Sequence, residues 1–332
     1  MVAVVVSLES SDIWTVSCNS NVSATDMLEN INLDLTGKII LTTGGDGHIA
    51  TQFNLALVKA NATVILACYN ADKCTKTAAT LISQTGMPAA RVETELLDLS
   101  SKEKIRAMAA NVTARHNATG LYALVNSAGS YSTRISVDGY VDAMEISLLG
   151  HALLTDLLLP LLRGNAEREK GRIVNVAEAV YGTQLLAPNN TVEYLTNVTK
   201  GLDAYVNATN GYSGLAKYLF IHHASELALR EKQVIAMSIN PGYAIEVAGI
   251  PQKLLKDLPK WLKSVFPSVW KIHEACSTNF KGLGACPELY EQSAAVWVVA
   301  SVWPNTDAHS GSYLDFDTTI LPPTAPHVFG LW

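Results

Sequence analysis

The chain has 332 residues, of which 48% are hydrophobic, with 24 Lys and Arg residues against 30 Asp and Glu residues. This length fits one large α/β domain or two small ones, and the apolar content is enough for a large buried core. The formal net charge of -6 and the absence of a long basic run exclude nucleic acid as the main partner.

Residues 1–35 show no clear periodicity, and we expect them to form an N-terminal extension ahead of the folded domain. The run MVAVVV at the start has no basic flank and no clear cleavage site, so it does not predict a signal peptide. The nearest match to a membrane span, 148–162, is shorter than the roughly 18 to 20 apolar residues required and contains His151, Asp156 and Pro160. We expect a core or interface helix there, no transmembrane helix, and a soluble or peripheral protein.

From Lys38 onward, short apolar runs alternate with helical patterns. Strands are predicted at 38–43, 62–70, 91–98, 121–129, 171–180 and 233–242, with a last strand at 310–317. Helices are predicted at 51–61, at 102–116, near 137–162, from Tyr212 onward and at 287–303. Strands that alternate with helices of this length favour a parallel sheet covered on both faces. The predicted fold is therefore α/β, a Rossmann-like doubly wound parallel sheet in three α/β/α layers, formed as a single domain by 36–332.

The segment 249–273 differs from the rest, because it mixes Lys with Trp, Leu and Phe at roughly helical spacing. We interpret it as a helical insertion packed on the body of the domain. A lid, a partner-binding helix and a peripheral membrane contact through 252–273 remain open alternatives.

Five cysteines show no metal-ligand spacing, and no metal site is predicted: Cys18, Cys68, Cys74, Cys276 and Cys286. Cys276 and Cys286 could pair, but unpaired thiols are the preferred interpretation. Seven Asn-X-Ser/Thr triplets occur, at Asn21, Asn61, Asn111, Asn117, Asn189, Asn197 and Asn207. They carry glycans only in a secretory compartment, so their use stays open.

The stretch TTGGDGHIA lies between the first predicted strand and the first predicted helix. It holds Gly44, Gly45 and Gly47, with Ala50 where a third close-packing glycine might stand. Backbone N–H groups at a helix N-terminus attract a pyrophosphate, and glycines let the backbone approach it. The position of this loop favours nucleotide binding.

The ordered set TTGGDGHIA, LLDLSS, LVNSAG, LGHALLTDLLLPLL, GRIVNV, NPG and SGSYLDFD resembles the short-chain dehydrogenase/reductase family, and most closely its retinol-dehydrogenase-like branch. The resemblance runs from about Leu35 to Asp317 and leaves out the first thirty-odd residues and 249–273. It implies a doubly wound fold that binds NAD or NADP and transfers hydride to or from an alcohol or carbonyl.

The glycine loop fits two family patterns. The pattern Thr-Gly-X-X-X-Gly-X-Gly puts His48 in the place of a glycine. The pattern Thr-Gly-X-X-Gly-X-X-Gly matches Thr43, Gly44 and Gly47, and only Ala50 departs from it. We favour the second pattern, which keeps nucleotide binding available.

The resemblance also implies the remaining cofactor contacts. Asp98 would hold the adenine, and the stretch that includes Asn126, Ala128 and Gly129 would line the floor of the site. Members that prefer NADP often carry Arg where this chain has Tyr69, and no acidic residue follows the second strand. The choice between NAD and NADP is therefore open.

The family's chemistry needs a Tyr hydroxyl as acid/base, a Lys that lowers the pKa of that Tyr, a Ser that holds the substrate oxygen, and a supporting Asn. On this resemblance Lys217 is retained. Ser147 takes the Asn place, Ser213 takes the Tyr place four residues before Lys217, and Ala177 and Glu178 take the place of two serines. Glu178 has the wrong charge to stabilise an alkoxide, and we interpret it as an ion-pair partner of Lys217.

Tyr212 lies five residues before Lys217. Neighbouring helix positions differ by about 100° in direction, so Tyr212 faces Lys217 only if a one-residue π-bulge realigns it. Two hypotheses follow. The first is a non-catalytic accessory or scaffold subunit, with protein partners or as a homo-oligomer. The alternative is an active NAD(P)-dependent oxidoreductase that uses Tyr212 on a small apolar alcohol or carbonyl as its small-molecule substrate.

Overall fold

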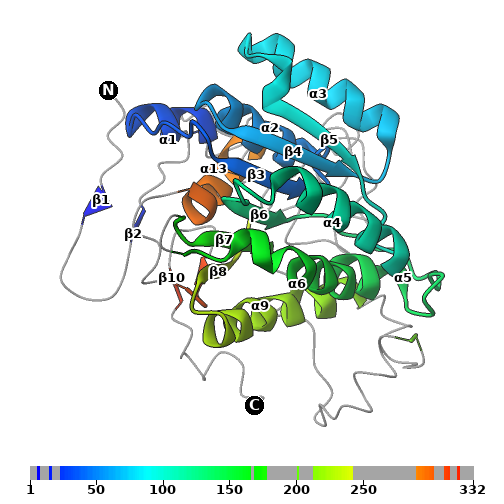
Figure 1. The fold of residues 1–332 in the computed structure, drawn as a ribbon. Coiled ribbons are helices and arrows are strands. Elements are labelled where there is room, and N and C mark those ends of the chain that lie inside the picture. The colour runs from blue at the N-terminus through cyan, green and yellow to red at the C-terminus, as the bar shows by residue number, and fades with distance from the viewer. Residues whose placement is uncertain are drawn as a thin grey trace, which may run out of the picture.

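A computed structural model of the chain describes residues 6–7, 15–16, 23–165, 168–177, 200–201, 212–241, 289–302, 310–314 and 320–321. These residues form a central sheet with helices on both faces (Figure 1). The predicted insertion at 249–273, Cys276, Cys286 and Glu178 lie outside the described residues.

The strands of the main sheet lie in the order β10-β9-β8-β7-β6-β3-β4-β5. Their bounds are β3 (Ile39–Thr43), β4 (Thr63–Cys68), β5 (Val92–Leu96), β6 (Ala123–Asn126), β7 (Gly171–Val176), β8 (Val234–Ile239), β9 (Tyr313–Leu314) and β10 (Ile320–Leu321). All neighbouring pairs are parallel except β9 with β10. The chain order reverses at β3, and in such sheets ligands bind where the carboxyl ends of the strands diverge.

Helices cover the sheet in two layers, which gives the three-layer arrangement expected from the sequence. One face carries α1 (Ala24–Asn30), α2 (His48–Lys59), α3 (Ala71–Thr85) and α13 (Leu289–Val302). The other carries α4 (Lys102–His116), α6 (Gly150–Leu162) and α9 (Tyr212–Arg230). Strands β3, β6, β7 and β8 are buried along their whole length, because both faces are covered. The Rossmann-like doubly wound fold is confirmed.

Part of the predicted N-terminal extension belongs to the domain. Residues 6–7 and 15–16 form a separate pair of short strands, β1 (Val6–Ser7) and β2 (Thr15–Val16). The helix α1, however, packs against α13 and α2, and its Met27 and Leu28 are buried in the core. The Ser23 side chain accepts a hydrogen bond from the Asp26 N–H, and the Asp26 side chain accepts one in return from the Ser23 N–H. Such a short helix shows too few turns for a periodic pattern, although its capping residues mark its start.

Two helices differ from the expected pattern. The helix α3 was not among the predicted helices, and it begins directly after Asn70, whose side chain accepts from the Lys73 N–H at 2.9 Å. The helix expected near 137 begins instead at Asp142, as α5 (Asp142–Met144), a π-helical turn (Glu145–Leu149) and α6. The expected start is wrong because Gly139, at φ 83°, closes a turn in which the Ser136 N–H donates to the Tyr140 carbonyl.

These three pieces form one apolar helical stretch. Asp142–Leu162 is 21 residues long, and by length and composition it could cross a membrane, although 61% of its apolar window is buried within the molecule. Its Leu154, Leu158 and Leu162 belong to the core between α4, α9 and the sheet. This burial favours the expected core helix.

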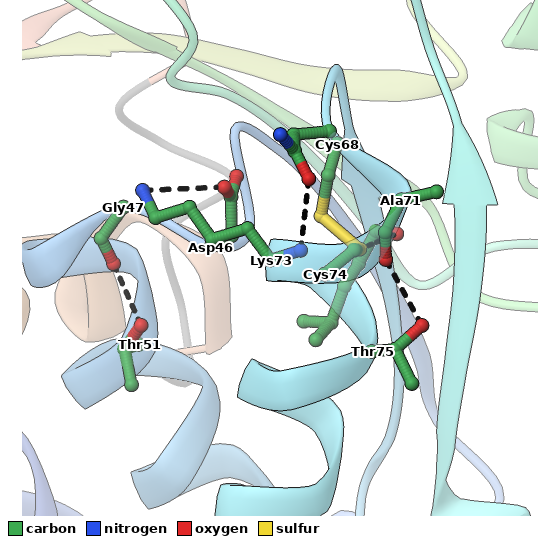
Figure 2. Close-up of a disulfide and its surroundings, with 10 residues drawn as sticks. Asp46, Gly47, Thr51, Cys68, Ala71, Lys73, Cys74 and Thr75 are labelled. Atoms are coloured by element: carbon green, nitrogen blue, oxygen red, sulfur yellow. Dashed lines mark hydrogen bonds and ion pairs between the residues drawn. A yellow bond between two sulfur atoms is a disulfide. The ribbon is translucent and has the colours of Figure 1, made fainter.

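A disulfide joins Cys68, the last residue of β4, to Cys74 in the first turn of α3, with a Cα–Cα distance of 5.9 Å (Figure 2). The preferred interpretation of unpaired thiols is therefore wrong for this pair. The reason is α3 itself, because a helix that starts at the third residue after β4 brings the sixth residue back over the strand end. The adjacent Cα atoms then lie within the range that disulfides span.

The packing of α1 predicts that Met27→Ala lowers the free energy of unfolding by about 2 to 5 kcal/mol, because it leaves a cavity in the core. The exposed residue Glu29 on the same helix provides the control, and Glu29→Ala should stay within about 0.5 kcal/mol of the unmodified chain. Urea denaturation of both variants measures the difference. Equal stability of the two would mean that α1 is an appendage outside the cooperative fold.

Candidate nucleotide-binding and catalytic site

The glycine loop leaves the carboxyl end of β3 and enters α2 at His48. Gly47 is the N-cap residue of α2 and has no side chain of its own to cap the helix. The first-turn N–H groups of any helix have no acceptor within the helix. At this place, with the positive end of the helix dipole, they form a binding site for an anion such as a pyrophosphate.

The loop packs closely on its neighbours. Gly44 has φ 62°, and a Cβ atom at this position would lie 3.2 Å from the Cα of Ala128. A Cβ atom on Gly45 would lie 3.0 Å from the Cα of Leu66. Glycine at these two positions therefore lets the loop, called here the glycine shelf, pack directly on the backbone of Leu66 and Ala128. Such a glycine-rich turn is the kind of backbone that a dinucleotide phosphate can approach closely.

Thr43 fixes this shelf to the rest of the site. Its hydroxyl oxygen accepts from the N–H groups of Ser127 at 2.9 Å and Ala128 at 3.1 Å. Because both acceptor positions are then used, the hydroxyl donates to Nε2 of His151, 2.8 Å away. Burial lowers the pKa of His151 well below its ordinary value, so the ring is neutral and able to accept this hydrogen bond.

The expected floor residues lie around this junction. Asn126, at the end of β6, donates to Asn175 on β7 at 3.0 Å and to Thr155 on α6 at 3.1 Å. Ala128 and Gly129 follow it in the turn that faces the glycine loop. The structure therefore brings Thr43, Gly44 and this turn together.

Asp98 lies just beyond the end of β5 and already has partners. Its Oδ1 accepts from the N–H and the hydroxyl of Ser100, and its Oδ2 is 2.9 Å from Nζ of Lys104. Partial burial alone would raise the pKa of Asp98, but the Ser100 and Lys104 hydrogen bonds outweigh it and lower the pKa. This carboxylate is charged at neutral pH and held in one orientation.

Lys217 and Ser147 meet at the other end of the shelf. Nζ of Lys217 donates to the carbonyl of Val176, the last residue of β7, at 2.7 Å. A Cβ atom placed on Gly129 would lie 3.6 Å from both Nζ of Lys217 and Oγ of Ser147. Ser147 accepts from the N–H of Ser130 at 3.1 Å. Lys217 and Ser147, which occupy the Lys and Asn positions of the family pattern, therefore lie close together beside Gly129.

Tyr212 packs in an apolar cluster at the start of α9. The helix α9 is a regular α-helix from Tyr212 to Arg230, without a π-turn, so Ser213 is the residue about one turn before Lys217. The Tyr212 side chain is 1% exposed and packs in an apolar cluster with Val141 and Met144. Its hydroxyl lies 3.9 Å from a Cβ placed on Gly201.

The π-helical turn in the described residues lies instead on the opposite helix, at Glu145–Leu149, with Ser147 at its centre. Glu145 is buried there, and desolvation raises its pKa to about 7. Close to neutral pH this carboxyl is therefore only partly ionised.

Of the two residues in the place of the family's serines, Ala177 is described. It is buried, and its N–H donates to the Ile239 carbonyl at 2.8 Å. The predicted ion pair with Lys217 involves Glu178, which lies outside the described residues. Among the described residues, no group of three or more His, Cys, Asp or Glu side chains is arranged to hold a metal.

Comparison with known proteins agrees with this geometry. Residues 38–187 match the family model described as short chain dehydrogenase. This part of the chain, a little under half of its length, is similar to the short-chain dehydrogenase/reductase family.

Curated relatives carry the names of oxidoreductases. The chain is 32% identical to mouse retinol dehydrogenase 13 over 63% of its own length and 59% of the relative. It is also 32% identical to the uncharacterized oxidoreductase C736.13 of Schizosaccharomyces pombe, over 63% of its own length and 61% of the relative. The chain thus spans about 60% of the length of these relatives.

A solved structure shows the same fold. The short-chain dehydrogenase/reductase from Brucella melitensis titled glucose/ribitol dehydrogenase superposes with a TM-score of 0.56 at 17% identity, over 88% of this chain and 98% of that one.

One contact of the glycine loop was not expected from the sequence. Nζ of Lys73 lies 3.3 Å from Oδ2 of Asp46, which joins the loop to the first turn of α3 (Figure 2). The two residues are far apart in the sequence, and the pairing depends on the unpredicted helix α3. The capping residue Asn70 was the one feature of the sequence that pointed to it.

The packing of the shelf predicts that alanine substitution destabilises the protein to different degrees at two glycines with positive φ. Gly37→Ala, at φ 79° with nothing within 4 Å of its Cβ, should lose about 1 to 2 kcal/mol of unfolding free energy from backbone strain alone. Gly44→Ala should lose at least about 1 kcal/mol more, because its methyl group meets Ala128. Denaturant titrations measure both. Equal losses would mean that the loop moves away without cost and is not a fixed shelf.

Proposed function

We propose that this chain binds a nicotinamide dinucleotide but does not carry out the family's usual hydride transfer, and that it acts as a non-catalytic accessory or scaffold subunit. The observation that carries this proposal is the helical phase of α9. Ser213, and not Tyr212, lies one turn before Lys217 on this helix. Tyr212 is buried among apolar side chains.

The nucleotide half of the proposal rests on the glycine shelf. The N-terminus of α2 would hold the pyrophosphate, with the backbone of Gly44, Gly45 and Gly47 close to it. Asp98 would lie beside the adenosine end of the dinucleotide, and the turn from Asn126 to Gly129 beside its nicotinamide end. When bound, the dinucleotide supplies the hydride donor or acceptor of the family's chemistry. The choice between NAD and NADP stays open.

The catalytic half rests on proton chemistry. A group that protonates an alkoxide must reach it and must have a pKa near the working pH. The Ser213 hydroxyl is much shorter than a Tyr side chain and far less acidic. Lys217 remains, but its ammonium group donates to the Val176 carbonyl and can lower the pKa only of a group placed beside it.

One observation favours the second candidate, an active NAD(P)-dependent oxidoreductase for a small apolar alcohol or carbonyl. The relatives are named retinol dehydrogenase and oxidoreductase, and names of this kind favour an active enzyme. Tyr212 would then have to leave its apolar cluster and reach the Lys217 side of α9.

An accessory role also requires a partner. We propose a protein partner or a second copy of the chain, with no nucleic acid, on a soluble or peripheral protein. The acidic net charge of -6 supports the exclusion of nucleic acid. The peripheral membrane contact proposed for 252–273 falls outside the described residues.

The test is a titration of the purified full chain with NADH and with NADPH, followed by thermal shift and by nicotinamide fluorescence. A ligand that binds only the native state raises the melting temperature as its concentration exceeds Kd. We expect clear stabilisation by one or both nucleotides, and no turnover above the protein-free blank with a panel of alcohols and carbonyl compounds.

Two variants separate the candidates. Turnover that is lost in both Lys217→Ala and Tyr212→Phe would establish the active enzyme and contradict the non-catalytic proposal. Tyr212→Phe keeps the buried ring, so its effect reports on the hydroxyl rather than on packing. No thermal shift with either nucleotide up to millimolar concentration would contradict the nucleotide half.

A further inference from the structure

The disulfide Cys68–Cys74 lies beside the glycine shelf. It closes a ring of seven residues that runs from the last residue of β4 into the first turn of α3 (Figure 2). Cys68 is 1% exposed and Cys74 is 2% exposed, so both sulfur atoms are buried in the layer between α3 and the sheet. The two sulfur atoms therefore belong to the core, whereas residues 69–73 between them are exposed.

One residue inside the ring, Lys73, contacts the glycine loop. Tyr69 is 74% exposed at the carboxyl end of β4. Asn70 caps α3 through the Lys73 N–H, and Nζ of Lys73 lies 3.3 Å from Oδ2 of Asp46. Asp46 stands between Gly45 and Gly47, and its side chain is only 13% exposed. The ring is thus connected through Lys73 and Asp46 to the loop that leads into α2.

We propose that this disulfide is a redox-sensitive modification site whose state sets the affinity of the chain for its dinucleotide. The inference rests on the nucleotide binding proposed above. The reductant is a dithiol. It transfers two electrons and two protons to the disulfide, the S–S bond breaks, two thiols form, and the dithiol becomes a disulfide.

Reduction acts on the shelf for two physical reasons. Opening the ring returns conformational freedom to 69–73, which the covalent link had removed. In addition, two thiols need more room than one disulfide, and a close-packed core has little room to give. The end of β4 and the first turn of α3 then separate, and Lys73 loses its fixed position beside Asp46.

The loss of that ion pair weakens anion binding at the loop. With Lys73 in place, the negative charge of Asp46 beside the helix N-terminus is balanced at 3.3 Å. Without it, Asp46 repels the phosphates of a dinucleotide at short range. The oxidised form is therefore the form with the higher affinity.

The relation is reciprocal. If oxidation tightens nucleotide binding by a given factor, bound nucleotide must make the disulfide harder to reduce by the same factor. For a two-electron couple, a tenfold change in affinity corresponds to a shift of about 30 mV in reduction potential.

The experiment uses the full chain, oxidised or reduced with dithiothreitol, with the thiols of each form counted by alkylation and mass spectrometry. Nicotinamide fluorescence titrations with NADH and NADPH then give Kd. We expect about tenfold weaker binding after reduction, within the range usual for coupled sites. The double variant Cys68→Ser/Cys74→Ser should bind like the reduced form and should not respond to dithiothreitol.

A matched pair of lysines tests the connection. Lys73→Ala in the oxidised chain should weaken binding, whereas Lys76→Ala, which removes an exposed charge from the same helix outside the ring, should not. If the serine double variant does not fold, the reduction potential of the unmodified chain with and without nucleotide serves in its place. A more negative potential with nucleotide supports the inference.

Equal Kd values for the oxidised and reduced forms would overturn this inference and leave the proposed nucleotide binding intact. Free thiols at Cys68 and Cys74 in the chain purified without reductant would overturn it as well. If neither form binds NADH or NADPH, the proposed nucleotide binding itself fails and the inference fails with it.

Discussion

The hydroxyl of Thr43 connects the glycine loop to the two elements that face it. It accepts from the backbone N–H groups of Ser127 and Ala128, which are partly buried, and donates to His151 on α6, which is fully buried like Thr43 itself. Removing this hydroxyl would leave two partly buried donors and a neutral imidazole without their shared partner, and such groups are costly to leave unpaired. The shelf, the turn after β6 and the helix that carries Ser147 therefore keep one arrangement.

In that arrangement, different features determine the two parts of the proposed function, nucleotide binding and the lack of catalysis. The glycine shelf is set by backbone packing, since Gly44 lies against Ala128. The N-terminus of α2, which begins directly after Gly47, is the feature of the shelf that points to an anionic ligand. In contrast, which residue occupies the acid/base position depends on its angular position around the helix α9. A shift of one residue moves a side chain by about 100°, so Tyr212 beside Ser213 cannot take its place in a regular helix.

Most of the fold could be predicted from the sequence, because β3, β4, β6, β7 and β8 are short apolar runs followed by turns or polar residues. The helices α1 and α3 were missed because their apolar residues are few, and they are marked mainly by the capping residues Ser23 and Asn70. The disulfide and the contact between Asp46 and Lys73 could not be predicted without α3, since the turn into that helix brings both pairs together. The burial of Tyr212 depends on residues near 141–144 and on tertiary packing, which a single helix pattern does not contain.

The central claim is that the cofactor shelf is intact and the catalytic hydroxyl is absent. A crystal structure of the full chain with NADH or NADPH bound tests both parts at once. We predict pyrophosphate at the N-terminus of α2 and a regular α9, with Tyr212 still in its apolar cluster and Ser213 facing the side of Lys217. A Tyr212 hydroxyl within hydrogen-bonding distance of Nζ of Lys217, or a dinucleotide bound away from the glycine loop, would contradict the account.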